Sequence, residues 1–186
     1  SDGSFDKYHP EIAIITNCEA DHLDHYGDEA HYRAAFVRHA EHATGHVVIC
    51  ADDADALAVL NALPAETASK AIAYGTADPS GLELNGAAYV HIVSEHESAG
   101  SGVERFTLRM PAGVAGEEPR EVPVELSVPG VHNARNAAAA LTAAMLLGVE
   151  SGEAAKAITG FLGAARRFQV RGTVKQVTVI DDYAHH

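Results

Sequence analysis

Polar residues crowd into a short loop directly after the first apolar run of the sequence, residues 12–16. The loop carries carboxylates and imidazoles that are able to bind a metal ion: Glu19, Asp21, His22, Asp24 and His25. In open α/β sheets, ligands bind outside the carboxyl ends of the strands. Magnesium prefers carboxylate and water oxygens, and histidine is a less usual ligand for it. The pattern leaves two interpretations open, a metal site and a polar loop whose aspartates cap the next helix.

A second group of binding residues stands at the start of an alanine-rich run. Asn133 and Asn136 are three positions apart, so on a helix they would share one face. A side-chain amide offers both a donor and an acceptor, which suits the edge of a nucleobase. Asn133 has a structural alternative as the N-cap of the helix. Asn136 lies one turn further in, where capping is less available, so the pattern favours a ligand-binding role for it.

Two more strings suit phosphate and sugar recognition. Arg166 and Arg167 are adjacent, and guanidinium groups bind phosphate through paired hydrogen bonds. Asp181 and Asp182 end an apolar run, and an acidic pair at the carboxyl end of a strand suits a ribose or a metal. A solvated turn and an ordinary strand end are the alternatives, and neither string decides alone.

The overall charge limits the partners of these groups. The 186 residues include 26 acidic and 13 basic side chains, a formal net charge of −13 with neutral histidines. Proteins that neutralise a nucleic-acid backbone are usually basic, so nucleic-acid binding is disfavoured. A small phosphate ligand stays compatible, because it needs only one local positive site.

The cysteines and the lengths of the apolar runs indicate the cellular compartment of the protein. Cys18 and Cys50 are far apart, which excludes a disulfide framework, argues against a cysteine zinc site and favours a reducing cytoplasm. No apolar run is long enough to cross a membrane, and no signal peptide is visible. The 12 histidines are scattered, so we expect most of them to be solvated or to cap helices.

Short apolar runs alternate with amphipathic segments in the first part of the sequence. We predict buried strands at 12–16, 46–51 and 71–74. We predict helices at 28–43, capped by Asp28, and from Asp52 or Asp53 to Pro64. Strands and helices that alternate over short connections indicate a parallel sheet covered on both faces.

The rest of the sequence has a different pattern. Between about 82 and 128, three runs alternate apolar and polar residues, which predicts a small antiparallel insert with Pro123 in an edge strand. Helices are predicted at 133–147, where an almost wholly apolar surface indicates burial, and at 151–162, and a last strand at 172–180. The expected fold class is α/β, with a mostly parallel sheet flanked by helices and a small antiparallel β insert.

Five strings, in order along the chain, resemble those of the Mur ligases, the ATP-dependent amide-forming enzymes of peptidoglycan synthesis. They are residues 1–5, 16–17 with 19–24, 129–130 with 132–133 and 136, 166–168, and 181–186. The first and last strings are most similar to those of the members that add L-alanine to UDP-N-acetylmuramate.

The resemblance implies a reaction and a set of site residues. In the implied reaction, ATP phosphorylates the carboxylate of UDP-N-acetylmuramate to an acyl phosphate, the amine of L-alanine attacks it, and phosphate leaves. Mg²⁺ and cationic groups neutralise the charge on the transferred phosphoryl group. The implied roles are Mg²⁺ binding and catalysis for His22, ATP phosphate binding and catalysis for Arg167, adenine binding for Asn133 and Asn136, ribose binding for Asp182, and contact with the UDP-sugar for His132. Glu19, Asp21 and Asp24 would assist.

The sequence also departs from the family pattern. The phosphate loop of the family ends in Gly-Lys-Thr or Gly-Lys-Ser, and this sequence has no Gly-Lys dipeptide. A family glutamate that helps to hold Mg²⁺ would lie before Ser1. We therefore expect residues 1–164 to be part of a central ATP-binding domain and 165–186 to begin a C-terminal ligase domain. We also expect the chain alone to be inactive.

Two alternatives stay open. Another Mur-type ligase, such as one that recycles murein peptides, would carry similar strings. A non-enzymatic, histidine-rich metal-binding module would account for the imidazoles without any reaction. The sequence does not give the oligomeric state.

Overall fold

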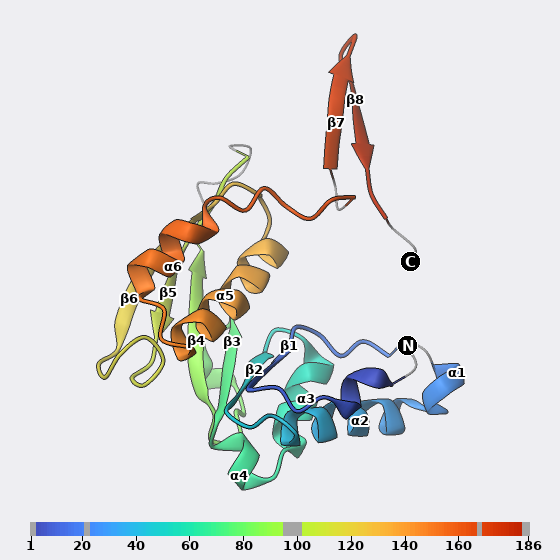
Figure 1. Ribbon diagram of the computed structural model, residues 1–186, viewed down its shortest axis with the longest axis vertical. Coiled ribbons are helices and arrows are strands. Elements are labelled where there is room, and N and C mark those ends of the chain that lie inside the picture. The colour runs from blue at the N-terminus through green and yellow to red at the C-terminus, as the bar shows by residue number, and fades with distance from the viewer. Residues whose placement is uncertain (1–2, 21–22, 95–101, 167–168, 184–186) are drawn as a thin grey trace.

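A six-stranded sheet, in the order β1-β2-β3-β4-β5-β6, forms the centre of the molecule, and a separate two-stranded sheet, β7-β8, follows it (Figure 1). The computed structural model describes residues 3–20, 23–94, 102–166 and 169–183. The strands are β1 (Ile12–Ile15), β2 (His46–Cys50), β3 (Ala71–Gly75), β4 (Ala88–Ser94), β5 (Glu104–Met110), β6 (Arg120–Leu126), β7 (Gln169–Val174) and β8 (Val177–Asp181). The helices are η1 (Ser4–Lys7), α1 (Leu23–Tyr26), α2 (Glu29–Glu41), α3 (Ala54–Ala62), α4 (Ala65–Ala68), η2 (Pro79–Gly81), α5 (Val131–Leu146) and α6 (Ser151–Ile158).

The first four strands are parallel, and the strands and helices predicted for the first part of the chain are confirmed. The Asp28 carboxylate caps α2 by accepting the backbone N–H of His31 at 2.9 Å. Of the two candidates for the second cap, Asp53 is the one that the structure uses, and it accepts the N–H of Ala56 at 2.7 Å. The structure adds a short helix, α4, after Pro64.

Successive residues of the central strands enter two different cores. In β2, Val47 and Ile49 pack with residues of α2 and α3, whereas Val48 and Cys50 pack with residues of α5. This alternation follows from the pleat of a strand, whose side chains point to opposite faces in turn. Both faces of β2 and β3 are covered, so these two strands have almost continuously apolar sequences.

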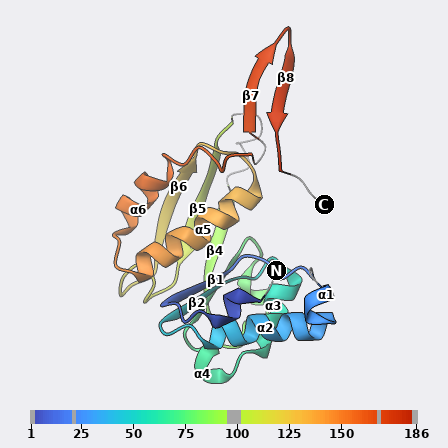
Figure 2. The ribbon, with the colours of Figure 1, turned by 45° about the vertical axis from the view of Figure 1, so that its right-hand side comes forward.

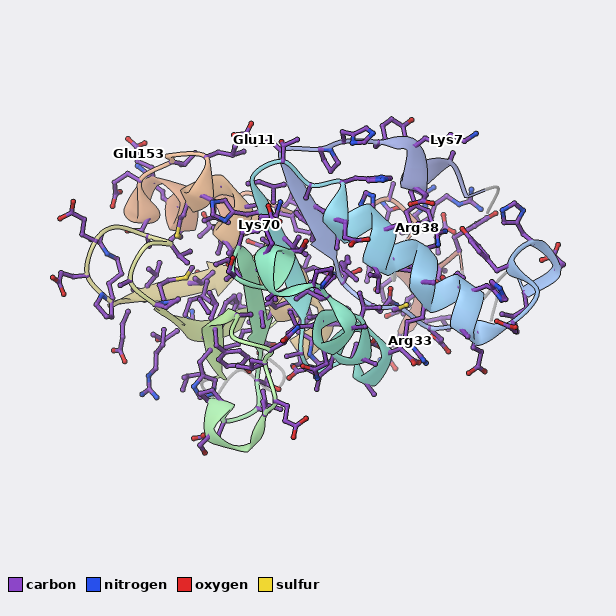
Figure 3. The ribbon with its side chains drawn as sticks, turned by 90° about the horizontal axis from the view of Figure 1, so that it is seen from below. Lys7, Glu11, Arg33, Arg38, Lys70 and Glu153 are labelled. Carbon is purple, nitrogen blue, oxygen red and sulfur yellow. The ribbon has the colours of Figure 1, made fainter. Side chains whose placement is uncertain are left out.

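Ion pairs fix α2 against its neighbours. Arg38 pairs with Asp6 of η1 at 3.0 Å, and Arg33 pairs with Asp55 of α3 at 2.5 Å. Figure 3 shows both arginines projecting from α2. Each of these largely solvent-accessible ion pairs contributes little. The packed face of α2 consists of the buried Ala40 and the partly buried Tyr32, Phe36 and Val37.

The predicted antiparallel pairing is confirmed, and it extends the main sheet. Strand β4 pairs in parallel with β3 and antiparallel with β5, which in turn pairs antiparallel with β6. Phe106, Leu108 and Met110 of β5 are buried and alternate with residues outside the core. Pro123 lies in β6, the last strand of the order, which confirms its predicted place at an edge.

Helix α5 lies on the sheet through small side chains. Its buried residues are Ala134, Ala137, Ala138, Ala139, Leu141, Thr142 and Met145. Alanine lets a helix approach a sheet closely, so the predicted burial holds for this face. It fails for the opposite face, where Asn136 and Ala140 are exposed. No helix in the described ranges is long and apolar enough to span a membrane.

Two sequence predictions near the C-terminus are wrong in detail. Helix α6 ends at Ile158, short of residue 162. The single strand predicted at 172–180 is a hairpin of β7 and β8, because Lys175 and Gln176 both have positive φ, 49° and 67°. Such a two-residue turn normally contains Asn-Gly or Asp-Gly, and Lys-Gln gives no such signal.

The hairpin stands apart from the main sheet in Figures 1 and 2. Its valines are largely exposed, for example Val174 at 69%. The Tyr183 N–H donates to the carbonyl of Arg166 at 2.7 Å, which links the hairpin to the segment before it. The predicted domain boundary between 164 and 165 falls in this exposed connecting segment and stays a prediction.

Leu108→Ala should lower the free energy of unfolding by about 2–5 kcal/mol, because it leaves a cavity in the larger core. Leu108 is 0% exposed and packs between the sheet and α5. Urea unfolding followed by circular dichroism measures the change. Val174→Ala, on the exposed hairpin, is the control and should stay within about 0.5 kcal/mol. Equal losses in the two variants would contradict the assignment of the core.

Candidate functional site

A pocket opens where the carboxyl ends of β1 and β2 meet the first turns of α5. Its volume is about 420 Å³, in the range of small-molecule sites. Three segments far apart in the sequence line it: Thr16 and Asn17 after β1, Cys50, Asp52 and Asp53 at the end of β2, and His132, Arg135 and Asn136 on α5. This is the edge of an open α/β sheet at which ligands bind.

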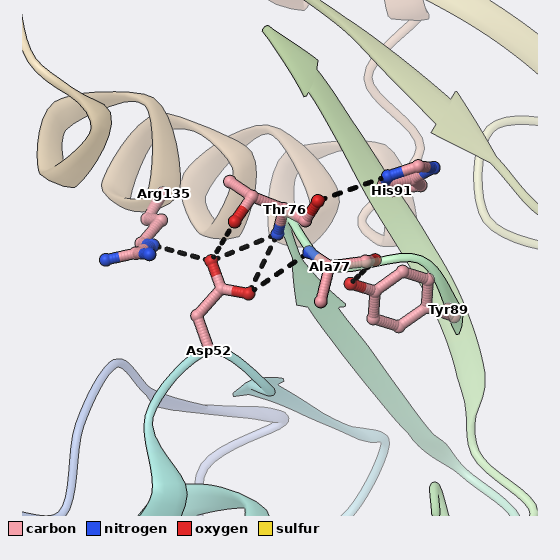
Figure 4. A network of polar contacts seen from close by, with 6 residues as sticks. All are labelled: Asp52, Thr76, Ala77, Tyr89, His91 and Arg135. Carbon is pink, nitrogen blue, oxygen red and sulfur yellow. Dashed lines mark hydrogen bonds and ion pairs between the residues drawn. The ribbon is translucent and has the colours of Figure 1, made fainter. Parts of the chain in front are cut away.

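Asp52 is the most connected polar side chain of the pocket. Its carboxylate, only 6% exposed, accepts the N–H of Thr76 at 2.9 and 3.0 Å and the Thr76 hydroxyl at 2.9 Å. The Arg135 Nε donates to it at 2.6 Å (Figure 4). Asp52 therefore joins the ends of β2 and β3 to α5.

The ionised form of Asp52 is favoured by these donors. Burial alone would raise the pKa of the carboxyl, but the hydrogen bonds from Thr76 and the Arg135 guanidinium outweigh it and lower the pKa below its ordinary value. The side chain is thus a carboxylate at neutral pH, and its charge is matched by Arg135.

Asp53 makes the corresponding contacts on the other side of β2. One of its oxygens accepts both the Ala56 N–H, which begins α3, and the Cys18 N–H at 3.1 Å. The second contact fixes the loop after β1. The two adjacent aspartates therefore position the two sides of the pocket independently.

Both cysteines near the pocket are buried and free. Burial, followed by the nearby carboxylates of Asp55 and Asp53, raises the pKa of Cys18 to about 11. Burial also raises the pKa of Cys50, which lines the pocket. Protonated thiols are poor nucleophiles and poor metal ligands, so the chemistry of the pocket rests on its amides, imidazole, guanidinium and carboxylates.

The residues predicted on α5 separate into two groups. His132 and Asn136 are exposed and line the pocket. The Asn136 amide makes no hydrogen bond to any other described residue, so its donor and acceptor are available to a ligand. Asn133 does not line the pocket, and its amide donates to the Pro129 carbonyl at 2.8 Å.

The N-cap interpretation of Asn133 is wrong. The helix begins at Val131, two residues earlier than predicted, and Gly130 occupies the cap position with no side-chain cap. Gly130 has φ 107°, and a Cβ there would come within 2.8 Å of the His132 ring. Glycine thus allows the turn and leaves room for His132. The Gly130 N–H donates to the Glu104 carboxylate of β5 at 2.9 Å.

The structure does not bring the remaining candidates into this pocket. Asp182 is exposed just after β8, on the separate hairpin. Glu19, Asp24 and His25 are exposed in the loop after β1 and in α1, and none of them lines the pocket. His22, Asp21 and Arg167 lie outside the described residues, so the structure does not test their roles.

A metal site is not formed by the described residues alone, since no group of three or more His, Cys, Asp or Glu among them is suitably placed. The predicted Mg²⁺ site, which depends on His22, therefore stays a prediction. The pocket does fit the base of a nucleotide, because Asn136 presents an amide that is bonded to no other described residue, in a cavity large enough for a small ligand.

Sequence reasoning missed Asp52 and Arg135. Asp52 stood out only as a possible helix cap, and Arg135 was assigned no role. Their contact joins positions 83 residues apart, and no local pattern signals such a pair. The only sequence signal was an extra aspartate beside the one needed for the cap.

Comparison with known proteins identifies the class. A family model described as the Mur ligase middle domain matches residues 1–144. The chain therefore belongs to the Mur ligase family, whose members are ATP-dependent ligases. This membership confirms the resemblance found in the sequence.

Two relatives from different genera are ligases of one name. The UDP-N-acetylmuramate–L-alanine ligase of Bifidobacterium longum (strain NCC 2705) is 71% identical over 187 residues, which cover 100% of this chain and 36% of the relative. The ligase of that name from Mycobacterium ulcerans (strain Agy99) is 40% identical over 189 residues, with the same two coverages. The chain thus spans about a third of the length of these relatives.

Solved structures show the same fold. A UDP-N-acetylmuramate–alanine ligase from Thermotoga maritima superposes with a TM-score of 0.71 at 24% identity, covering 100% of this chain and 37% of that one. A murein peptide ligase from Psychrobacter arcticus has a TM-score of 0.63 at 26% identity, covering 98% of this chain and 33% of that one. The predicted fold class is confirmed.

Asp52→Asn should lower the free energy of unfolding at pH 7 by about 1–3 kcal/mol, because the half-buried Arg135 loses its carboxylate partner. Folding lowers the pKa of the Asp52 carboxyl below its ordinary value near 4. The ionised carboxylate therefore stabilises the folded state at pH values above about 4. This stabilisation is lost as the pH falls through the lower pKa of the folded state. The difference between variant and parent should therefore shrink below about pH 4.

Urea unfolding at pH 7, 5 and 3 measures this prediction. Glu117→Gln, at an exposed carboxylate, is the control and should change little at any pH. A loss for Asp52→Asn that is as large at pH 3 as at pH 7 would show that the charge of Asp52 is not what stabilises the fold.

Proposed function

We propose that the chain is the nucleotide-binding middle part of an ATP-dependent ligase that joins L-alanine to UDP-N-acetylmuramate in peptidoglycan synthesis. The observation that carries the proposal is the 71% identity, over the whole chain, to a ligase of that name. The pocket at the carboxyl ends of β1 and β2 supports it, because that edge of the sheet suits a nucleotide.

Each residue of the pocket has a role in this proposal. Asn136 hydrogen-bonds the adenine edge with its side-chain amide, and His132, also lining the pocket, faces the UDP-sugar. Asn133 assists from the first turn of α5, although its amide is already bonded to Pro129. The helix also directs the positive end of its dipole toward the pocket, which favours an anionic ligand.

Further roles are proposed from the family resemblance alone. His22 would hold Mg²⁺, with Glu19, Asp21 and Asp24 assisting, and His22 and Arg167 would act in catalysis. Arg167 would bind an ATP phosphate and Asp182 the ribose. When bound, ATP supplies the phosphoryl group that converts a carboxylate into an acyl phosphate with ADP as the leaving group, so that an amine displaces phosphate in the next step.

The cellular setting is part of the proposal. Two buried, free thiols are typical of a reducing compartment, and ATP is the proposed cosubstrate. We therefore place the whole protein in the cytoplasm. No nucleic-acid partner is proposed, in keeping with the net charge of −13.

A full-length ligase that carries this chain as its middle part tests the substrate assignment. With ATP and Mg²⁺, it should release phosphate and form an amide with UDP-N-acetylmuramate and L-alanine. A tripeptide in place of L-alanine should react much more slowly. Faster reaction with the tripeptide would instead favour a murein-peptide recycling ligase. The 186-residue chain alone should form no amide, since it lacks a Gly-Lys phosphate loop.

Asn136→Ala in the full-length ligase should weaken ATP binding and leave stability unchanged or improved. Alanine favours a helix more than asparagine does, whereas an adenine amine without its acceptor should cost about 1–3 kcal/mol, or about one to two decades in affinity. Calorimetric titration with a non-hydrolysable ATP analogue measures the affinity.

Asn61→Ala provides the matched control, because Asn61 is an exposed asparagine on α3, outside the pocket. Its affinity for the analogue should equal that of the parent. Unchanged affinity in Asn136→Ala would return Asn136 to a structural role and remove the adenine contact from the proposal.

A further inference from the structure

We propose that Arg135 and Asp52 form a positioning pair that sets where α5 presents His132 and Asn136 to the nucleotide. This inference rests on the proposed function, because it concerns the same pocket. Arg135 immediately precedes Asn136 and lines the pocket with it. Asp52 receives Arg135 from one side and Thr76 from the other (Figure 4). The pair therefore links the asparagine-bearing helix to the ends of two strands.

The start of α5 has few other polar anchors. Its N-cap, Gly130, contributes no side chain, and its own N–H is bonded to Glu104 of β5. The buried alanines that follow pack through non-directional apolar contacts. The charged hydrogen bond from Arg135 to Asp52, at 2.6 Å, restricts the position of the helix in distance and direction more than these apolar contacts do.

Burial makes the link sensitive to the loss of either partner. The Asp52 side chain is 6% exposed and that of Arg135 is 35% exposed. Removing one member of such a pair leaves the other charge without its partner, and α5 or the loop at Thr76 must shift to hydrate it. A shift of about 1 Å is enough to impair a binding geometry.

A direct contact between Arg135 and the nucleotide is the competing explanation. Among the described residues, only the Nε of the guanidinium is engaged, by Asp52. The two explanations differ in what they require of Asp52. A positioning pair needs both partners, whereas a direct contact needs Arg135 alone.

The experiment compares Arg135→Gln, Asp52→Asn and the double variant in a full-length ligase carrying this chain. Titration with a non-hydrolysable ATP analogue should show each single variant binding about 5- to 30-fold more weakly, with the double variant no worse than the weaker single one. The KM for ATP should rise more than kcat falls. Arg135→Lys, which keeps the charge, should recover most of the affinity.

A second cycle tests whether the pair acts through Asn136. In an Asn136→Ala background, Arg135→Gln should change the affinity by less than about twofold, because there is no asparagine left to misplace. Arg109→Gln, which removes an exposed pair with Glu121 at 2.9 Å on the β5–β6 edge, is the matched control and should bind like the parent.

Three results would overturn the inference. Weak binding by Arg135→Gln with parental binding by Asp52→Asn would establish direct contact. Parental affinity in both would show that the pair only stabilises the fold. Where Asn136→Ala itself weakens binding, additive losses from Arg135→Gln and Asn136→Ala would show that the pair does not act through the asparagine. If Asp52→Asn does not fold, Asp52→Glu, which keeps the charge but displaces the carboxylate from Arg135, replaces it, and the same comparison with Arg135→Gln decides.

The outcome for the proposed function is read separately. Parental affinity in Asn136→Ala alone would remove the adenine contact from that proposal. The positioning role of the pair would then be tested by Arg135→Gln and Asp52→Asn alone. Equal and non-additive losses of affinity in these two variants support positioning through His132 and the rest of the pocket. Independent losses of affinity overturn the positioning role.

Discussion

Two adjacent carboxylates at the end of β2 hold the surrounding elements in one arrangement. In an extended segment, neighbouring side chains point in opposite directions, so Asp53 reaches the loop after β1 and the start of α3, whereas Asp52 reaches Thr76 after β3 and Arg135 on α5. Each carboxylate satisfies backbone or side-chain donors that would otherwise be unpaired at the buried edge of the sheet. The pocket exists between these contacts, and its shape depends on both.

The two cores explain why a binding site can form at this edge. Helices α2 and α3 cover one face of β2, and α5 covers the other, so β2 is buried along its length and a ligand can approach it only at its end. Residues after β1 and β2 and the first turns of α5 converge there. Membership in the Mur ligase family gives this pocket a functional context, and it argues against the separate class of a histidine-rich metal-binding module.

The candidate residues illustrate how far a motif predicts a site. Asn133 and Asn136 have the same residue type and lie on one helix, yet only Asn136 lines the pocket, since Asn133 is bonded to Pro129 in the first turn. Asp182 belongs to the same set of family strings, yet it follows directly after β8, the last strand of a hairpin with its own short sheet. A motif predicts the chemistry of a residue, whereas its distance from other residues depends on packing.

The sequence by itself determined the strands 12–16, 46–51 and 71–74, the cap at Asp28, the edge position of Pro123 and the family, because these depend on local apolar patterns, local hydrogen bonds or ordered strings. It narrowed the second cap to Asp52 or Asp53, and the structure decided for Asp53. The hairpin at Lys175 and Gln176 escaped it, since neither residue type prefers positive φ. Only the tertiary structure decided which asparagine faces the pocket, and only it paired Asp52 with Arg135. Such a contact depends on how α5 packs across the sheet, and that packing is set by the summed burial of many small side chains, which no short segment encodes.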